Sequence, residues 1–187
     1  MSEIMLNLGC ADRHQAGFLN VDIAQPADKI VDLAQPWPWD TSSVSEVLAL
    51  DVCEHIGDCD HVSTSCVGCL IPDADVTDPG LNYRHKLGRI HFMNELHRVL
   101  APGGRATIET PNASRGCGYF QDPTHVSPWC MSTFRYFEFG AFAHTRLAKA
   151  YGITAAFRIL SLTEIETPGE CSPEKAWKIT AILEAVK

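Results

Sequence analysis

The sequence predicts an α/β fold with a mixed sheet, and three observations carry this prediction. The apolar run Ile4–Leu8 ends at Gly9, a pattern typical of a strand covered on both faces in a parallel sheet. A strand-like segment, an amphipathic segment, 87–100, a glycine turn and another strand-like segment follow one another, which makes a βα unit. Two strand-like segments joined by a short loop end the chain, and so short a connection makes them antiparallel.

Three further strand candidates follow the first run. Phe18–Asp22 and Val44–Leu50 are short apolar stretches, and Gly104–Thr110 follows the turn Pro102–Gly103. All three end at or near polar residues. Ligands of open parallel sheets bind at the carboxyl ends of the strands, so we expect the functional residues to lie along that edge.

Helical periodicity is clearest between residues 87 and 100, where apolar side chains recur every three or four positions: Leu87, Ile90, Met93, Leu96 and Leu100. This helix must end by Ala101, because Pro102 disfavours helical geometry in the residue before it. The aromatic-rich stretch Ser132–Ala150 also predicts a helix, which Gly140 weakens in its middle.

The C-terminal part predicts a β-hairpin. Segments 156–164 and 177–186 are strand-like, and in the second of them apolar and polar residues alternate. The linking residues 167–173 are rich in turn formers. An antiparallel pair at the end of a parallel sheet makes the whole sheet mixed.

Composition and charge limit the function. The 187 residues are 45% hydrophobic, which fits one globular domain, 1–187, with a core that needs no disulfides. The 15 basic residues are scattered and 23 are acidic, so at a net charge of -8 nucleic acid and anionic membranes are poor partners. Neither a signal peptide nor a membrane span is apparent, so we expect a cytoplasmic location.

The loop after the first strand, Gly9–Asp12, together with Asp22 indicates a nucleotide-type cleft. Glycine lets the backbone turn sharply toward a ligand, and a carboxylate ending the next strand can accept both hydroxyl protons of a ribose. The alternative is a plain turn with a surface aspartate. Ala11 and His14 stand where a dinucleotide fingerprint needs glycine and a small residue, so the pyrophosphate cradle is missing. A ligand with a ribose but no phosphate fits this loop.

Six segments, covering most of residues 4–125, carry a family resemblance: Leu6–Asp12, Gly17–Asp22, Asp32–Leu33, Leu50–Ile56, Phe92–Gly104 and Glu109–Asn112. In this order they resemble the class I S-adenosylmethionine-dependent methyltransferases, specifically the compact methyltransferase type 11 proteins of bacteria and their phages. The resemblance implies a Rossmann-like fold with a seven-stranded mixed sheet and an antiparallel final hairpin. It also implies methyl transfer from S-adenosylmethionine to an acceptor, which we expect to be a small molecule.

The resemblance further implies a cofactor site. Its residues would be Gly9, Cys10 and Ala11 on the methionine side, Asp22 at the ribose, Asp32 with Leu33 at the adenine, and Asp51 near the amino acid moiety. Two features depart from the family pattern. The family prefers glycine where Ala11 stands, and the 12 residues between Gly9 and Asp22 are too few for the helix that usually joins the first two strands, a shortening that the compact subfamily shares.

Little catalytic machinery is expected, because a methyl sulfonium is already electrophilic and the protein need only align the reactants and accept a proton. The candidate proton acceptors are His125 and Asp122, in a segment, 113–131, that we expect to form a lid on the substrate side. Glu54 and His55 follow the strand candidate Val44–Leu50, and we expect them to support these two proton acceptors from behind. The alternative for His125 is a histidine that merely caps the turn 122–124.

Residues 57–86 lose hydrophobic periodicity and are rich in Cys, Asp, Pro, Gly and His, so we interpret them as a Cys/His-rich surface insertion. Four potential zinc ligands lie within eleven residues of it: Cys59, His61, Cys66 and Cys69. The Cys-x-x-Cys half has the usual spacing, whereas the Cys-x-His half is short. A structural zinc ion and four unligated side chains are both compatible with this pattern.

Three functional interpretations follow from the sequence. The first is an active small methyltransferase. The second is a methyltransferase fold that binds the cofactor without catalysis, for which Ala11 is the main support. The third is a zinc-organised interaction protein whose cleft is incidental. The sequence does not indicate the methyl acceptor or the oligomeric state.

Overall fold

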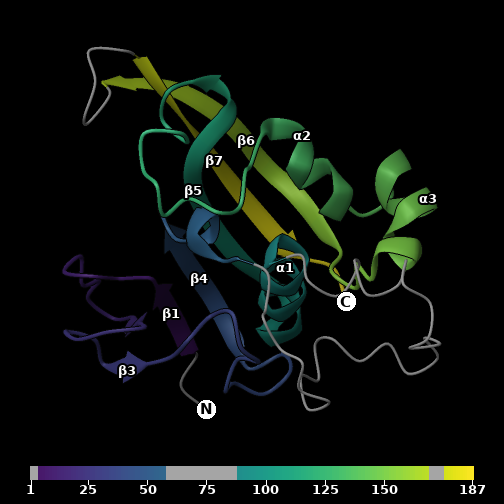
Figure 1. Cartoon of the computed structure of the whole chain (residues 1–187). Helices are drawn as coiled ribbons and strands as arrows, with labels where there is room; N and C mark the ends of the chain where they lie inside the picture. Colours follow the sequence, from purple (N-terminus) through teal and green to yellow (C-terminus); the bar gives the residue numbers. More distant parts are fainter. Residues whose placement is uncertain (1–3, 58–87, 169–174) are drawn as a thin grey trace, which may run out of the picture.

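The computed structural model of the chain describes residues 4–57, 88–168 and 175–187 (Figure 1). Seven strands form one sheet in the order β3-β2-β1-β4-β5-β7-β6. Their bounds are β1 (Ile4–Leu8), β2 (Leu19–Asp22), β3 (Lys29–Ile30), β4 (Val44–Leu50), β5 (Leu100–Gly116), β6 (Phe157–Pro168) and β7 (Lys175–Ala185). The first five strands pair in parallel, and β7 is antiparallel to both β5 and β6. The predicted mixed sheet and its antiparallel final hairpin are confirmed.

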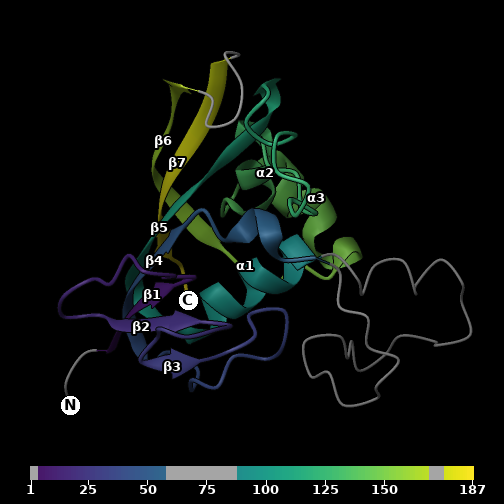
Figure 2. The ribbon, with the colours of Figure 1, turned by 60° about the vertical axis from the view of Figure 1, so that its left-hand side comes forward.

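The helices lie on one face of this sheet. Figure 2 shows α1, α2 and α3 together on the same side of the strands. The helical segments are η1 (Cys53–His55), α1 (Gly88–Val99), α2 (Met131–Phe134), η3 (Arg135–Phe137) and α3 (Phe142–Tyr151). The core forms where α1 meets the strands: Phe92, Met93 and Leu96 on the helix are fully buried, as are Leu8 and Ile108 on the sheet. The apolar stripe that predicted α1 therefore faces the sheet.

On the opposite face, the link between β1 and β2 contains no helix. It is a hydrogen-bonded loop that folds over the sheet: Asn7 Nδ2 donates to Arg13 O at 2.9 Å, and Gln15 N donates to Asn20 Oδ1 at 2.7 Å. Asn7 also donates to Asn20 Oδ1, which ties β1 to β2 beneath this loop. These bonds satisfy two polar side chains that are 5% and 6% exposed. The shortened connection expected from the sequence is thus a structured turn.

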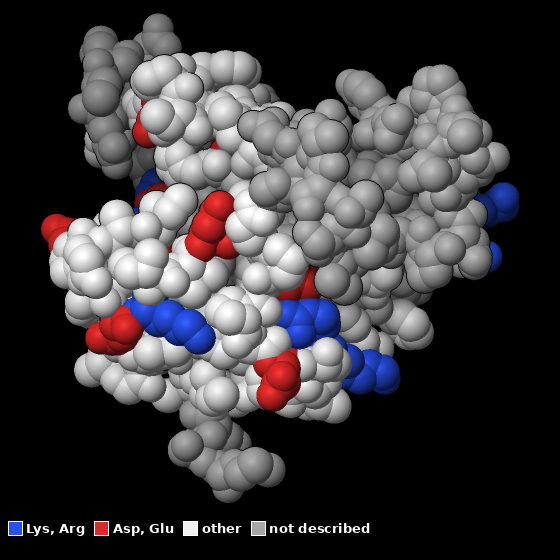
Figure 3. Space-filling view, turned by 60° about the horizontal axis from the view of Figure 1, so that its bottom comes forward, with Lys and Arg blue, Asp and Glu red and all other residues white. Residues whose placement is uncertain are grey.

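Part of this face carries charged side chains. Glu46, Arg105 and Glu184 are neighbours on adjacent strands and alternate in sequence with buried apolar residues. Another side of the molecule, in Figure 3, shows acidic and basic side chains interspersed among uncharged ones. A groove for a nucleic acid backbone would need basic side chains gathered together. On the face drawn in Figure 3, the basic side chains do not line up in such a groove.

The long link between β3 and β4, residues 31–43, is held against α1 by several contacts, among them those of the ion pair Glu95–Arg98. Glu95 Oε2 accepts a hydrogen bond from Trp37 N at 2.7 Å, and Glu95 Oε1 pairs with Arg98 Nε at 2.7 Å. Arg98 also donates to the carbonyl oxygens of Trp37 and Trp39. Glu95 and Arg98 thus anchor a segment that has no helix of its own.

The prediction of a single helix over residues 132–150 is wrong. These residues form α2, η3 and α3 instead, and Glu138 and Ala141 have extended conformations between η3 and α3. Gly140 has φ +79°, in the left-handed region, which ends the helical path. The strand predicted at 104–110 is longer than expected, because β5 continues to pair with β7 as far as Gly116.

Several expectations concern residues outside the described ranges. Cys59, His61, Cys66 and Cys69, and the insertion beyond Gly57, all lie there, so the zinc site stays a prediction. No helix among the described residues is long and apolar enough to cross a membrane. Two of the cysteines that the structure does describe, Cys10 and Cys53, are buried thiols.

Candidate functional site

The strand order places a topological switch at the carboxyl end of β1. From β1 the chain builds outward through β2 and β3, and then returns to the other side of β1 as β4. Loops that leave two neighbouring strands in opposite directions open a crevice at their carboxyl ends. The predicted residues Gly9, Asp22 and Asp51 each end or directly follow a strand at this edge.

The turn after β1 packs directly against the segment after β4. Gly9 has φ +62°, and a Cβ atom there would lie 2.4 Å from Val52 Cγ2, which is far below van der Waals contact. Only glycine fits this position. Ala11 is also left-handed, at φ +44°, although it carries a side chain. Cys10 is 1% exposed, so it presents its backbone rather than its thiol to the edge. Burial and the negative charge of Asp22 raise the pKa of this thiol.

Asp22 faces the turn across the crevice. Its Oδ2 accepts a hydrogen bond from Ala11 N at 2.8 Å, and its Oδ1 accepts one from Ala24 N at 3.1 Å. A carboxylate oxygen has two lone pairs, so each oxygen keeps one acceptor position. The carboxylate is therefore held in place by the backbone and can still receive two hydroxyl protons.

Asp32 and Leu33 follow β3, and the first lies at the surface whereas the second lies in the core. Val31 N donates to Asp22 O at 2.8 Å, which places the segment beside the end of β2. Asp32 is exposed, and its Oδ1 accepts a hydrogen bond from Ala34 N at 2.9 Å in an Asx turn. Leu33 is 5% exposed and packs in the core. Of these two predicted cofactor residues, Asp32 is the accessible one.

Asp51 lies at the centre of a charge network that the sequence did not predict. Its Oδ2 accepts a hydrogen bond from Lys178 Nζ at 2.8 Å and pairs with Arg13 Nη1 at 3.3 Å. Lys178 also donates to Glu109 Oε1 at 3.1 Å. Burial acts to lower the pKa of Lys178, but the two carboxylates outweigh it and raise that pKa, so the ammonium stays charged. Asp51 Oδ1 is buried and, within the described chain, has no hydrogen-bond partner.

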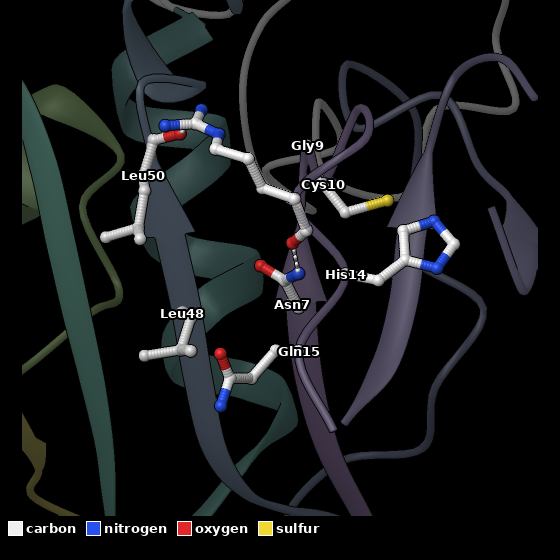
Figure 4. A pocket seen from close by; sticks show the side chains of 8 residues that line it. Asn7, Gly9, Cys10, His14, Gln15, Leu48 and Leu50 are labelled. Carbon is white, nitrogen blue, oxygen red and sulfur yellow. Dashed lines mark hydrogen bonds between the residues drawn. The ribbon is translucent and has the colours of Figure 1, made fainter. Parts of the chain in front are cut away.

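A small cavity lies behind the turn, on the sheet face opposite α1 (Figure 4). Its volume is about 160 Å³, and its lining combines one residue of β1 and five residues of the following loop with two leucines of β4: Asn7, Gly9, Cys10, Arg13, His14, Gln15, Leu48 and Leu50. Sites for whole small-molecule ligands usually measure at least about 300 Å³. This cavity is too small to enclose such a ligand, so the open edge is the larger surface available for binding.

The segment expected to form a lid is folded onto the residues that follow β4. Glu54 O accepts hydrogen bonds from Val126 N at 3.0 Å and Ser127 N at 2.9 Å. Trp129 is fully buried, and its Nε1 donates to Cys53 O at 3.3 Å. These contacts bring His125 and Asp122 to the carboxyl end of β4, about 70 residues away in sequence from η1.

His125 is held in place by a bond outside its own turn. Its side chain is 7% exposed, and its Nδ1 lies 2.7 Å from Tyr119 O. Its Nε2 lies 3.7 Å from Asp122 Oδ2. The turn 122–124 is instead capped by Asp122, whose Oδ1 accepts hydrogen bonds from the backbone and the hydroxyl of Thr124. Capping the turn is therefore not what the imidazole of His125 does.

Glu54 is fully buried beside His55 and His125. Its Oε2 accepts a hydrogen bond from Thr110 Oγ1 at 3.0 Å, whereas its Oε1 has no partner among the residues described. Burial raises the pKa of Glu54 to about 7, and the negative charge of Asp51 acts in the same direction. One side-chain donor atom from each of Glu54, His55 and His125 lies within 4.8 Å of the other two. The sequence singled out these residues but did not predict that they form one cluster.

Comparison with solved structures places this fold. A putative methyltransferase from Bacillus halodurans superposes with a TM-score of 0.59 at 10% identity, covering 100% of this chain and 94% of that one. A SAM-dependent methyltransferase from Methanosarcina mazei gives 0.56 at 12% identity, with coverages of 100% and 94%. Haemonchus contortus phosphoethanolamine N-methyltransferase 2, in complex with phosphomonomethylethanolamine and S-adenosylhomocysteine, gives 0.52 at 11% identity, with coverages of 100% and 49%.

No protein family profile and no curated protein sequence matches the chain significantly. At identities of 10% to 12%, the comparison with solved structures establishes architecture rather than activity. The sheet order, the antiparallel final hairpin and these superpositions agree with the fold expected from the sequence. This chain has the Rossmann-like fold of the class I S-adenosylmethionine-dependent methyltransferases.

Proposed function

We propose that the carboxyl edge of the sheet binds S-adenosylmethionine and that the protein transfers its methyl group to a small-molecule acceptor. One observation carries this proposal: the carboxylate of Asp22 is fixed opposite the Gly9–Ala11 turn and keeps one free acceptor position on each oxygen. A ribose with two adjacent hydroxyl groups matches those positions. Folds of this kind bind nucleotides in the crevice at the strand switch, and Asp22 ends β2 at that edge, which supports the proposal.

The residues at the methionine end also fit the cofactor. Asp51 Oδ1 is buried and receives no hydrogen bond from the described residues, and the ammonium group of the methionine moiety is a donor that would supply one. Arg13 covers Asp51 with a side chain that is 53% exposed, so it can move aside without leaving a core. Its guanidinium would then be free to pair with the methionine carboxylate. Both roles concern residues that already lie at the end of β1 and β4.

The sulfonium supplies an electrophilic methyl group when the cofactor is bound. The chain must then orient the acceptor and take its proton, and His125 and Asp122 are the proposed proton acceptors. Because a carbonyl oxygen only accepts, His125 Nδ1 must carry a proton toward Tyr119 O, and Nε2 has the free lone pair. The acidic surface favours a small acceptor over a nucleic acid backbone.

A second function, cofactor binding without catalysis, is favoured by one observation. Ala11 adopts φ +44° and donates its backbone N–H to Asp22, so its methyl group stands in the turn where the family has glycine. That methyl group would crowd the cofactor at the turn. Measurable binding of S-adenosylhomocysteine with no methyl transfer to any of a broad panel of acceptors would select this second function.

Calorimetric titration with S-adenosylhomocysteine tests cofactor binding, and Asp22→Asn is expected to weaken it about tenfold. The substitution removes the negative charge. The NH2 group of the asparagine would also face the backbone N–H of Ala11 or Ala24, so that two donors oppose each other. Hydrogen bonds to a charged group contribute about 1.5 to 3 kcal/mol, so a tenfold loss is a modest expectation.

Asp12→Asn is the matched control, because it makes the same charge change on an exposed side chain of the same loop. It should leave the affinity unchanged. Equal affinity of wild type and Asp22→Asn for S-adenosylhomocysteine would remove Asp22 from the site and with it the observation that carries the proposal.

A further inference from the structure

We propose that Glu54, His55 and His125 form a binding site for a divalent transition-metal ion, which joins η1 to the segment 113–131. One side-chain donor atom from each residue lies within 4.8 Å of the other two. Two imidazole nitrogens and one carboxylate oxygen are a ligand set for zinc and for other borderline divalent ions. This site is separate from the Cys/His-rich insertion, and it does not depend on binding of S-adenosylmethionine.

The carboxylate of Glu54 has an unused oxygen in a buried place. The residue is 0% exposed, and Thr110 satisfies only its Oε2. Its Oε1 is buried without any hydrogen-bond partner among the described residues. A buried oxygen with no partner costs free energy, and a cation is one group that would satisfy it. Glu54 therefore gives a physical reason for a ligand at this point.

Hydrogen bonds fix the tautomers of both histidines. His125 Nδ1 lies 2.7 Å from the carbonyl oxygen of Tyr119 and must donate to it, so its Nε2 carries the lone pair. The hydroxyl of Thr124 donates to Asp122 Oδ1, so its oxygen accepts a hydrogen bond from His55 Nδ1 at 3.1 Å. In the neutral imidazole His55 then also presents Nε2. Metal-binding histidines commonly donate their second ring N–H in this way.

The geometry needs only a local contraction. Zn–N and Zn–O bonds of about 2.0 to 2.1 Å in a tetrahedral site bring ligand atoms to about 3.3 Å from one another. Glu54 and His125 are held by buried contacts, whereas His55 and its hydrogen-bond partner Thr124 are both exposed and can shift together toward them. Three protein ligands leave at least one position open for water or for an oxygen of a substrate.

The surrounding charges are compatible with a cation. Asp122 Oδ2 lies 3.7 Å from His125 Nε2, and Asp51 contributes negative charge near Glu54. Lys178 contributes positive charge there, but it is paired with both Asp51 and Glu109. A bound ion would occupy the lone pair of His125, and Asp122 would then be the proton acceptor left for catalysis.

Calorimetric titration with Zn²⁺ tests the site, in a background where Cys59, Cys66 and Cys69 are serine so that the thiols of the insertion do not contribute. We expect one equivalent of Zn²⁺ to bind. Glu54→Gln keeps the size of the side chain and can keep its bond to Thr110, and it should weaken binding about 100-fold. His125→Ala should do the same. His144→Ala is the matched control, because its imidazole bonds Ala155 O elsewhere in the fold and should not matter.

A titration with Co²⁺ on the unaltered chain gives an independent readout. Nitrogen and oxygen ligands give visible Co²⁺ bands without the thiolate charge-transfer band that cysteine ligands add. Glu54→Gln should therefore weaken the visible bands and leave unchanged any charge-transfer band that the unaltered chain shows. The absence of bound Zn²⁺ in the serine background, or equal affinity with and without Glu54 and His125, would overturn the proposal. Neither outcome depends on S-adenosylhomocysteine, so a failure here is distinguishable from failure of the proposed function.

Discussion

Gly9→Ala is expected to abolish measurable binding of S-adenosylhomocysteine and to lower the melting temperature by roughly 10 °C. The left-handed backbone at φ +62° costs an alanine about 1 to 2 kcal/mol. The new methyl group would also lie 2.4 Å from Val52 Cγ2, and overpacking of this kind costs about 1 to 3 kcal/mol. Either the turn after β1 or the segment after β4 must shift, and both carry residues of the site. Thermal unfolding and calorimetry measure the two effects.

Gly103→Ala separates the contact from the backbone conformation. Gly103 has a similar φ of +75°, but a Cβ atom there would meet nothing within 4 Å. It should therefore lower the stability only by the backbone cost of about 1 to 2 kcal/mol and leave cofactor binding unchanged. If both variants lost stability equally and both still bound S-adenosylhomocysteine, the contact between Gly9 and Val52 would have no role in shaping the site.

Glu95→Gln is expected to lower the free energy of unfolding by about 2 kcal/mol at neutral pH. Breaking a buried ion pair costs about 3 to 5 kcal/mol, and we expect less because the Arg98 side chain is 32% exposed. Burial acts to raise the pKa of Glu95, but the hydrogen bonds from Arg98 and Trp37 outweigh it and lower that pKa below its usual range. Urea unfolding of both proteins measures the difference.

The pH dependence of that difference follows from the direction of the shift. A carboxyl group whose pKa is lower in the folded state stabilises the fold above its unfolded pKa and loses this contribution as the pH falls through the folded value. The advantage of wild type over Glu95→Gln should thus be complete at pH 7 and shrink below the ordinary glutamate value of 4.5. An advantage that grew on acidification would contradict the assigned ion pair.

Glu138→Gln provides a matched control for the ion pair. Arg135 and Glu138 have the same spacing and the same 2.7 Å separation as Glu95 and Arg98, but the Arg135 side chain is 55% exposed. Solvent screening leaves such pairs with less than about 1 kcal/mol. The two substitutions therefore compare burial with spacing held constant, and similar losses in both would show that burial does not set the strength of these pairs.

Local sequence patterns predict most of this fold. The three- and four-residue spacing between residues 87 and 100 places α1 at Gly88–Val99, because one apolar stripe must face the sheet. The alternation after Trp177 predicts β7, and the short loop before it predicts the antiparallel pairing with β6. The 12 residues between Gly9 and Asp22 correctly indicate that no helix joins β1 to β2, since a helix with its two turns does not fit in that length.

Contacts between distant residues are what the sequence leaves out. Lys178 pairs with Asp51 across 127 positions, and no local pattern marks that lysine as part of the site. From the sequence, a glutamate in the loop after β4 is expected to be exposed. In the structure, segment 113–131 packs against this loop, and Glu54 is completely buried next to His55 and His125. The helix predicted over 132–150 fails for a local reason, because Gly140 takes a left-handed conformation in its middle. The contacts of Lys178 and of Glu54, unlike the conformation of Gly140, depend on the assembled fold.

A crystal structure of the protein with S-adenosylhomocysteine would show directly whether the carboxyl edge of the sheet binds the cofactor. We expect both ribose hydroxyl groups to lie within hydrogen-bond distance of the Asp22 carboxylate and the amino group of the homocysteine moiety to reach Asp51. Electron density for the compound elsewhere, with the Asp22 oxygens bonded only to Ala11 and Ala24, would contradict it.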